Sequence, residues 1–212
     1  MNQKTIYLIR HGQTNYNRMG IVQGGGIDSD LNELGLQQAQ AFFEHYQHIP
    51  FDKIYTSTLK RSIQSVKQFI DKNIPWEQHA GLNEINWGHR EGTKITPEED
   101  AYYYSVIESW SKGEIDLRID GGESPTDVVT RQKPVLDLIL SRPEEKNILI
   151  CMHGRAMRMF LCLMLNYPLQ CMDVFEHQNL CLYKLHYSGN MFTVESYNDV
   201  THLGGLDIPT IS

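Results

Sequence analysis

The sequence predicts an α/β fold with one largely parallel sheet. Strand-like runs alternate with helix-like runs over most of the 212 residues, a pattern typical of parallel strands joined by helices. The run at 5–10, TIYLIR, is β-branched and aromatic with little polarity, as expected for a strand that is covered on both faces. No linker, repeat or low-complexity segment divides the chain, so residues 1–212 are predicted to form a single domain.

Composition narrows the possible functions. Hydrophobic residues make up 41% of the chain and charged residues 21%, which favours a folded globular protein over a disordered one. The 19 basic and 26 acidic residues give a net charge of −7, the wrong sign for a general nucleic-acid binder or for a protein that binds anionic membranes. No secretory signal is visible, and the most apolar stretch, 156–165, is too short to span a bilayer. The four cysteines lack CxxC spacing, so we expect packing residues with free thiols in a cytoplasmic compartment.

The first half of the chain contains three predicted strands and two predicted helices. A helix at 32–48 begins at a capping Asn32, with acidic Glu33 in its first turn. Its expected buried stripe is Leu36, Ala39, Phe43 and Tyr46. The other elements, after the strand at 5–10, are a strand at 53–56, a helix at 58–72 and a short strand at 76–79.

The segment at 93–120 differs from the rest of the chain. It is polar, weakly periodic and acidic, with three basic residues against seven acidic ones. It is predicted to be an insertion over the scaffold, either a lid that shapes a ligand pocket or a surface helical excursion. Trp87 and Tyr102–Tyr104 are expected either to contact an apolar leaving group or to pack under this insertion.

The second half continues the alternation. Ser124 caps a helix, with Pro125 at its first position and Asp127 completing a capping box, and Pro134 is expected to break or kink that helix. The remaining elements are a buried strand at 147–152, an apolar helix after Gly154, and a hairpin whose strands, 180–187 and 191–197, flank the turn at 188–190.

Two predicted strands end in the same dipeptide, His11-Gly12 and His153-Gly154. Because ligands of open α/β sheets bind at the carboxyl ends of strands, we expect these two histidines to face one pocket. The helix that follows Gly154 should direct its first N–H groups to the same place, which favours an anion. His45 and His48, by contrast, lie on a helix face and are expected at the surface.

Arginines collect around these strand ends. Arg10 adjoins the first histidine, Arg61 lies in the first turn of the helix at 58–72, and Arg155 follows the second His-Gly pair. The guanidinium fork matches phosphate oxygens, so the set predicts a phosphate pocket built without a metal ion. In such a pocket a neutral His11 imidazole would attack phosphorus, and Glu84 is a candidate proton donor for the leaving oxygen.

These residues carry a resemblance to a known family. The chain resembles the histidine phosphatase superfamily, also called phosphoglycerate-mutase-like, over almost its whole length. The matching segments are Arg10 to Thr14 with Asn17, Gln23-Gly24 with Asp28 to Gly35, Ser57 to Ser62, Leu82 to Gly92, Gly122 to Ser124, His153-Gly154, and Asn198 with His202-Leu203.

The resemblance implies a three-layer αβα sandwich and phosphoryl transfer with no metal and no cofactor. It implies that His11 accepts the phosphoryl group, that Arg10, Arg61 and His153 surround it, and that Glu84 is the general acid. The residues expected at the substrate are Asn17, Gln23, Gly24, Gly154 and Arg155.

The chain also departs from the family's pattern. Gly25 and Asp30 stand where many relatives have an aromatic residue and a proline, and this loop is one residue longer. Arg155 replaces a small or polar residue, so it either contacts a second anionic group of the substrate or is an exposed arginine at the helix start.

Three functions are compatible with this pattern. The favoured one is a phosphatase acting on small phosphomonoesters, the second is a cofactor-dependent phosphoglycerate mutase, and the third is a non-catalytic phosphate-binding protein. A mutase of this family carries an adjacent arginine pair in its inserted segment, whereas residues 93–120 hold only Lys94, Lys112 and Arg118. We therefore expect a small-molecule phosphate ester as the substrate, with polyanions disfavoured unless Arg155 reaches their second anion.

Overall fold

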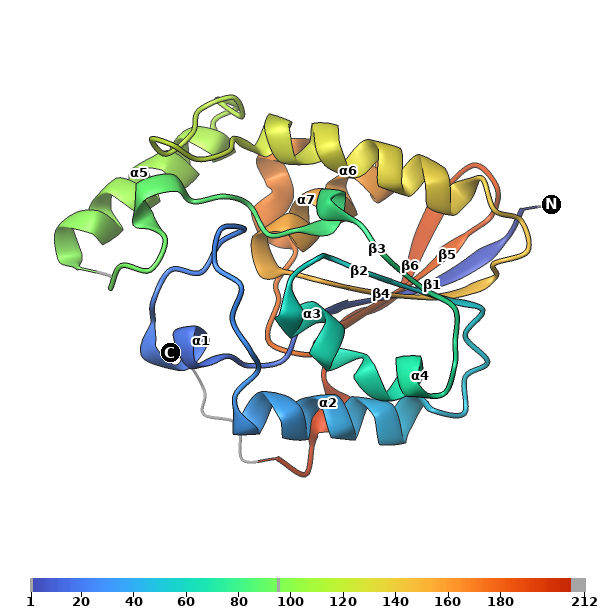
Figure 1. Ribbon diagram of the computed structural model, residues 1–212. Coiled ribbons are helices and arrows are strands. Elements are labelled where there is room, and N and C mark those ends of the chain that lie inside the picture. Colours follow the sequence, from blue (N-terminus) through green and yellow to red (C-terminus); the bar gives the residue numbers. More distant parts are fainter. Residues whose placement is uncertain (1, 95, 207–212) are drawn as a thin grey trace.

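The computed structural model describes residues 2–94 and 96–206, so both ends of the predicted domain and residue 95 of the inserted segment lie outside the described residues. One six-stranded sheet runs through the molecule in the order β3-β2-β4-β1-β5-β6 (Figure 1). The strands are β1 Lys4–Arg10, β2 Lys53–Thr56, β3 Trp76–Gln78, β4 Asn147–Met152, β5 Leu182–Tyr187 and β6 Phe192–Asp199. The first four pair in parallel and β5 and β6 add an antiparallel edge, which confirms the largely parallel sheet.

Helices cover both faces of this sheet, so the three-layer αβα arrangement is confirmed. Figure 1 shows α6 and α7 on one face and α2, α3 and α4 on the other, with α5 and the short α1 beside the carboxyl ends of the parallel strands. The helices are α1 Asn15–Met19, α2 Glu33–Tyr46, α3 Lys60–Ser65, α4 Lys67–Asp71, α5 Pro97–Ser111, α6 Pro125–Leu140 and α7 Gly154–Leu165. Short 3-10 turns lie at Ala80–Leu82, Gly88–Arg90, Leu169–Val174 and Thr201–Leu203.

The centre of the sheet explains why the two His-Gly pairs come together. Strands β1 and β4 are neighbours, and their register pairs Arg10 with Met152, the residue before His153. Ile148 to Met152 are fully buried, because helices pack on both sides of them. Equal register at parallel strand ends therefore places His11 and His153 side by side.

The cap of α2 agrees with the prediction, and its buried stripe agrees in part, since Ala39 and Tyr46 are buried as expected but Leu36 and Phe43 are not. The Asn32 side chain accepts a hydrogen bond from the Gly35 amide at 2.9 Å, as a helix cap should. Phe42 rather than Phe43 is fully buried, and Leu36 is 54% exposed. The stripe is rotated by about one position because Gly35 packs its backbone against Gln13, which brings the 35–38–42 side of the helix onto the sheet.

The predicted helix at 58–72 is interrupted. It forms two short helices, α3 and α4, with a break at Val66. The Ser62 and Ser65 hydroxyls donate to carbonyls of Leu59 and Arg61 at 2.8 and 2.7 Å, contacts of the kind that bend helices. Ser65 Oγ also accepts from the Gly12 amide at 2.9 Å, so the break coincides with a contact to the strand that carries His11.

Of the two effects expected of Pro134, a break is wrong, because α6 is continuous from Pro125 to Leu140, while a kink stays a prediction. Because proline has no N–H group, the Thr130 carbonyl lacks its usual hydrogen bond within the helix. Both Pro134 and Thr130 are exposed, so solvent can satisfy that carbonyl. The start of α6 is as predicted, with a complete Ser124–Asp127 capping box.

The C-terminal hairpin is confirmed, with β5 and β6 antiparallel around Ser188 to Met191.

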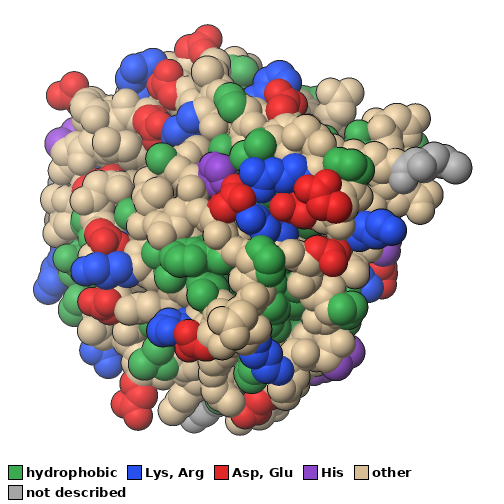
Figure 2. Space-filling view, turned by 45° about the vertical axis from the view of Figure 1, so that its right-hand side comes forward, with side chains coloured by type: hydrophobic (Ala, Val, Ile, Leu, Met, Phe, Trp, Pro, Cys, Tyr) green, Lys and Arg blue, Asp and Glu red, His purple; other side chains and the backbone are tan. Residues whose placement is uncertain are grey.

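The cysteines are free, with Cys171 alone less than fully buried. None of the helices among the described residues is long and apolar enough to cross a membrane. On the face shown in Figure 2, basic and acidic side chains are interspersed rather than gathered by sign.

Candidate active site

The two predicted histidines lie together at the carboxyl ends of β1 and β4. Their ring centroids are 5.1 Å apart, and both side chains are buried. The His11 amide donates to the Met152 carbonyl at 3.0 Å, so the pairing of the two strands continues up to the site itself. The prediction that two separate strands bring these histidines to one place is confirmed.

The hydrogen bonding of His11 fixes its tautomer. Its Nδ1 lies 2.7 Å from the Gly12 carbonyl oxygen, which can only accept, so Nδ1 carries the proton and Nε2 keeps a free lone pair. Burial, together with the neighbouring Arg61 and Arg10 guanidinium groups, holds the pKa of His11 well below its usual value of 6.5. His11 is therefore neutral at neutral pH, and among the described residues its Nε2 lone pair has no hydrogen-bond donor.

Arg61 and His153 are held by each other. Arg61 Nε donates to His153 Nδ1 at 3.2 Å, which leaves the proton on His153 Nε2, 2.7 Å from Ser57 Oγ. Burial first, and then Arg61, keep the pKa of His153 well below 6.5 as well. Burial lowers the pKa of Arg61 to about 10, so its guanidinium still carries a full positive charge at neutral pH.

Arg10 has a partner that the sequence did not indicate. Its Nη1 lies 3.3 Å from His177 Nδ1, and its Nε has no hydrogen-bond partner among the described residues. The His177 ring lies against Gly154, where a Cβ would come within 2.6 Å of the imidazole. Gly154 is thus required by this ring, and Arg10 presents an N–H group that no protein acceptor uses.

The glycine-rich loop that contains Gly24 lies against the Arg61 guanidinium. Arg61 donates to the carbonyls of Ile27 and Gly24, at 2.5 and 3.1 Å. A Cβ on Gly24 would lie 2.6 Å from the backbone carbonyl oxygen of Ile85, so only glycine fits there. With its side-chain oxygen facing the guanidinium, Gln23 accepts a hydrogen bond from Arg61 Nε at 2.8 Å. The side-chain nitrogen of Gln23 then donates to Thr14 Oγ1 at 2.7 Å.

Asn17 is fixed beside the loop that follows His11. Its Oδ1 accepts from the Thr14 amide at 3.2 Å and from Asn179 Nδ2 at 3.3 Å. Asn179 Nδ2 also donates to the His11 carbonyl at 3.0 Å. Asn179 thereby joins the predicted substrate residue Asn17 to the backbone of His11.

Glu84 is buried and lies where α7 begins. Its Oε1 accepts from the Ala156 amide at 2.8 Å and its Oε2 from the Arg155 amide at 3.1 Å. The sequence predicted that these helix N–H groups would be available to a bound anion. In the structure the Glu84 side chain occupies the Arg155 and Ala156 amides instead, because it reaches this helix end from the loop at 83–87.

Arg155 is not the exposed helix-start arginine considered above. Its side chain is only 11% exposed, with Nη1 bound to Asp173 and Nη2 2.9 Å from Tyr103 Oη. Asp173 also pairs with Arg158. The guanidinium joins α7 to α5 and to the turn at Leu169–Val174, so its direction is set by three segments that are far apart in the sequence.

The aromatic residues near the inserted segment divide into two groups. Trp87 stacks on Trp110 with centroids 5.9 Å apart and meets Tyr103 edge-on at 5.3 Å, so these rings pack under the insertion. Tyr102 and Tyr104 are exposed. Core packing is therefore the observed role of Trp87 and Tyr103. His45 and His48 are exposed on or just beyond α2, as predicted.

Sequence reasoning missed several residues that shape the site. Ser57 lay in a matched segment without an assigned role, and nothing in the spacing distinguished His177 or Asn179. The contacts of His177 and Asn179 depend on the loop before β5, where Leu180 adopts a left-handed conformation with φ 55°. Among residues 2–94 and 96–206, no group of three or more His, Cys, Asp or Glu is placed to hold a metal ion.

Comparison with known proteins identifies the family of the chain. The chain is 29% identical to a protein named probable phosphoglycerate mutase GpmB from Yersinia pestis (strain Pestoides F), over 97% of this chain and 96% of that one. The solved structure of Bacillus stearothermophilus YhfR matches with a TM-score of 0.81 at 26% identity, covering 94% of this chain and 99% of that chain. A mycobacterial glucosyl-3-phosphoglycerate phosphatase shares the fold, with a TM-score of 0.81 at 23% identity over 93% of this chain and 100% of that chain. The model of the histidine phosphatase superfamily (branch 1) matches residues 6–200, and the chain belongs to this superfamily.

Proposed function

We propose that this member of the histidine phosphatase superfamily hydrolyses small phosphomonoesters through a phosphohistidine on His11. The observation that carries the proposal is the state of that imidazole, which is neutral, with its Nδ1 proton tied to Gly12 and its Nε2 lone pair free. It lies beside the buried Arg61 and the half-buried Arg10, whose positive charges favour binding of the dianionic phosphoryl group and its transition state.

The reaction proceeds in two balanced steps. His11 Nε2 attacks phosphorus, the bond to the ester oxygen breaks, and the Glu84 carboxyl group gives its proton to that leaving oxygen. Water then attacks the phosphohistidine, Glu84 takes a proton from it, and the P–N bond breaks to release phosphate. Arg10 and Arg61 balance the charge on the phosphoryl oxygens in both steps.

The inserted segment supports hydrolysis over mutase chemistry. A mutase must hold a second acidic group of its substrate, which requires free cations near the leaving group. Of the three cations in the segment, Lys112 pairs with Glu108 and Arg118 with Asp127 at the exposed surface, and Lys94 is exposed as well. The Arg155 guanidinium is already bound by a carboxylate and a tyrosine hydroxyl. The mutase remains the second candidate because of the name of the Yersinia relative.

Phosphate release distinguishes the candidates. Native protein, His11→Ala and the control His45→Ala, which alters an exposed histidine of α2, are incubated with chelator and an aryl phosphate, sugar phosphates or 3-phosphoglycerate. We expect release by native protein and by His45→Ala, and none by folded His11→Ala. Conversion of 3-phosphoglycerate to 2-phosphoglycerate without release would assign the mutase. Phosphate binding with neither activity on this panel would favour a non-catalytic role.

A further inference from the structure

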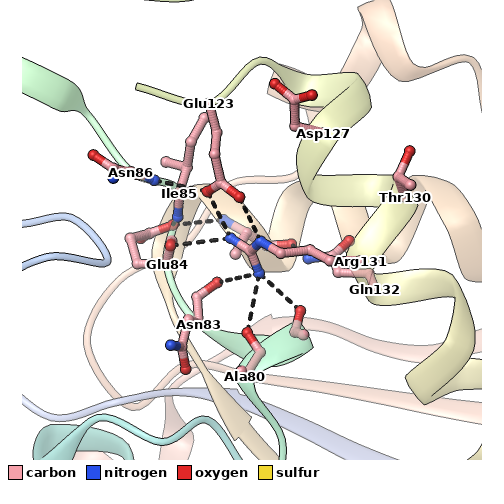
Figure 3. A network of polar contacts seen from close by, with 12 residues as sticks. Ala80, Asn83, Glu84, Ile85, Asn86, Glu123, Asp127, Thr130, Arg131 and Gln132 are labelled. Atoms are coloured by element: carbon pink, nitrogen blue, oxygen red, sulfur yellow. Dashed lines mark hydrogen bonds and ion pairs between the residues drawn. The ribbon is translucent and has the colours of Figure 1, made fainter. Parts of the chain in front are cut away.

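The Arg131 side chain of α6 connects the helix layer to the segment that carries Glu84. Its Nη1 donates to the carbonyls of Gly81 and Asn83 at 2.8 and 3.0 Å, and its Nη2 donates to the carbonyl of Glu84 at 3.1 Å (Figure 3). On its other edge, Nε and Nη2 make a two-pronged contact with the Glu123 carboxylate at 2.8 and 3.0 Å. One guanidinium thus spans backbone and carboxylate acceptors in a single plane.

Glu123 holds the same segment from the other side. Its Oε2 accepts from the Asn86 amide at 2.9 Å, and its own amide donates to the Asn86 carbonyl, also at 2.9 Å. Figure 3 shows the Glu123 carboxylate between Arg131 and the backbone at 85–86. Residues 83–87 belong to no helix or strand, so these side chains supply the fixed contacts that regular structure provides elsewhere.

The far end of this arrangement is the Glu84 carboxylate. It lies on the Arg155 and Ala156 amides, next to the residues that surround the phosphoryl site. Arg131 touches the Glu84 backbone and not its carboxylate, so it acts on the carboxyl group only through that backbone. Any movement of the carbonyls at 81–84 would shift the carboxyl group relative to His11.

We propose that Arg131, oriented by Glu123, is the positioning residue that sets where the Glu84 carboxyl group meets the leaving oxygen. This inference rests on the proposed function, in which Glu84 donates the proton. A displacement of about 1 Å at a reacting group costs on the order of 100-fold in rate. Lysine in place of Arg131 keeps the charge but cannot contact Glu123 and three carbonyls in one plane.

A residue that only stabilises the fold and a residue that positions the general acid differ in how their loss affects esters with different leaving groups. The phenolate released from p-nitrophenyl phosphate is stable without a proton, whereas the alkoxide released from glycerol phosphate must be protonated. A misplaced general acid therefore slows the alkyl ester selectively, while a loosened fold slows both esters alike.

The experiment compares Arg131→Lys with Arg118→Lys, the same change at an exposed ion pair on the inserted segment. We expect kcat/KM of Arg131→Lys to fall roughly 100-fold for glycerol phosphate and less than about fivefold for the aryl ester. Inhibition by inorganic phosphate should change less than about twofold, and Arg118→Lys should match native protein on both esters. In a Glu84→Gln background, Arg131→Lys should cause no further loss on the alkyl ester.

Equal losses on the two esters, or full additivity with Glu84→Gln, would overturn the positioning role. Hydrogen exchange tests it without turnover: in Arg131→Lys the Asn86 and Ala156 amides should exchange faster, while the Gly12 amide, bound to Ser65, should not change. Unchanged protection of Ala156 would also refute the proposal. Failure of the proposed function is separate, since native protein would then release no phosphate from either ester.

Discussion

Gly154 should tolerate a methyl group only when His177 is shortened. The glycine is the first residue of α7, and its φ is not positive, so alanine fits the backbone there. A Cβ would lie 2.6 Å from His177 Cε1 and 2.8 Å from Nε2, well inside van der Waals contact. Overpacking of this kind costs about 1–3 kcal/mol, whereas the helix propensity of alanine returns at most about 1 kcal/mol.

The steric clash with His177 lowers the unfolding free energy, whereas the helix propensity of alanine raises it. Gly154→Ala should lower the unfolding free energy of the native protein, and should leave it unchanged or raise it in a His177→Ala background. The coupling energy between the two positions should be about 1–3 kcal/mol. Because a displaced His177 ring releases Arg10 Nη1, the single variant should also bind phosphate esters more weakly.

Urea unfolding of native protein, Gly154→Ala, His177→Ala and the double variant measures the coupling energy between the two positions. Gly205→Ala is the matched control, since nothing lies within 4 Å of where its Cβ would be. Additive effects at Gly154 and His177, or a Gly154→Ala protein as stable as native, would show that the two residues do not press on each other.

Three further predictions concern burial and buried polar contacts in and near the site. The unfolding free energy should fall as the pH drops below about 6.5, because His11 and His153 take up protons in the unfolded chain but stay neutral in the folded protein. Each histidine contributes up to about 1.4 kcal/mol per pH unit. Equal unfolding free energies from urea titrations at pH 7.5 and 5.5 would contradict the lowered pKa of both groups. Ser57→Ala should destabilise the protein by about 1–3 kcal/mol, because it leaves the buried His153 Nε2 proton without its acceptor; a thermal unfolding midpoint identical to native would show that this contact contributes nothing. Tyr103→Phe removes the hydroxyl bound to Arg155, and we expect faster limited proteolysis within α5, with an unchanged cleavage rate as the refuting result.

Local signals in the sequence were sufficient for most elements. The capping residues Asn32 and Ser124 start helices where predicted, since a cap depends on residues only three positions away. The placement of His11 beside His153 was also predictable, because parallel strands of one sheet bring their carboxyl ends to the same edge. The roles proposed for His11, Arg10, Arg61, His153 and Glu84 rest on the family resemblance and stay predictions.

Errors occurred where a distant segment overrides a local pattern. The apolar period of α2 predicted a buried Leu36, but the contact of Gly35 with Gln13 decides which side of the helix meets the sheet. The helix after β2 breaks at Val66, beside a serine that binds the strand carrying His11.

The sequence by itself determined most of the helices and strands and which strand ends carry the two histidines, because periodicity and capping depend on residues that are close together in the sequence. Only the tertiary structure decided where the polar side chains find partners. The Glu84 carboxylate lies on the first amides of α7, Arg155 reaches Asp173, and Arg131 holds the loop at 81–84. The physical reason is that a buried polar group must be satisfied by whatever acceptor or donor lies within reach, and that partner is set by the packing of segments dozens of residues apart.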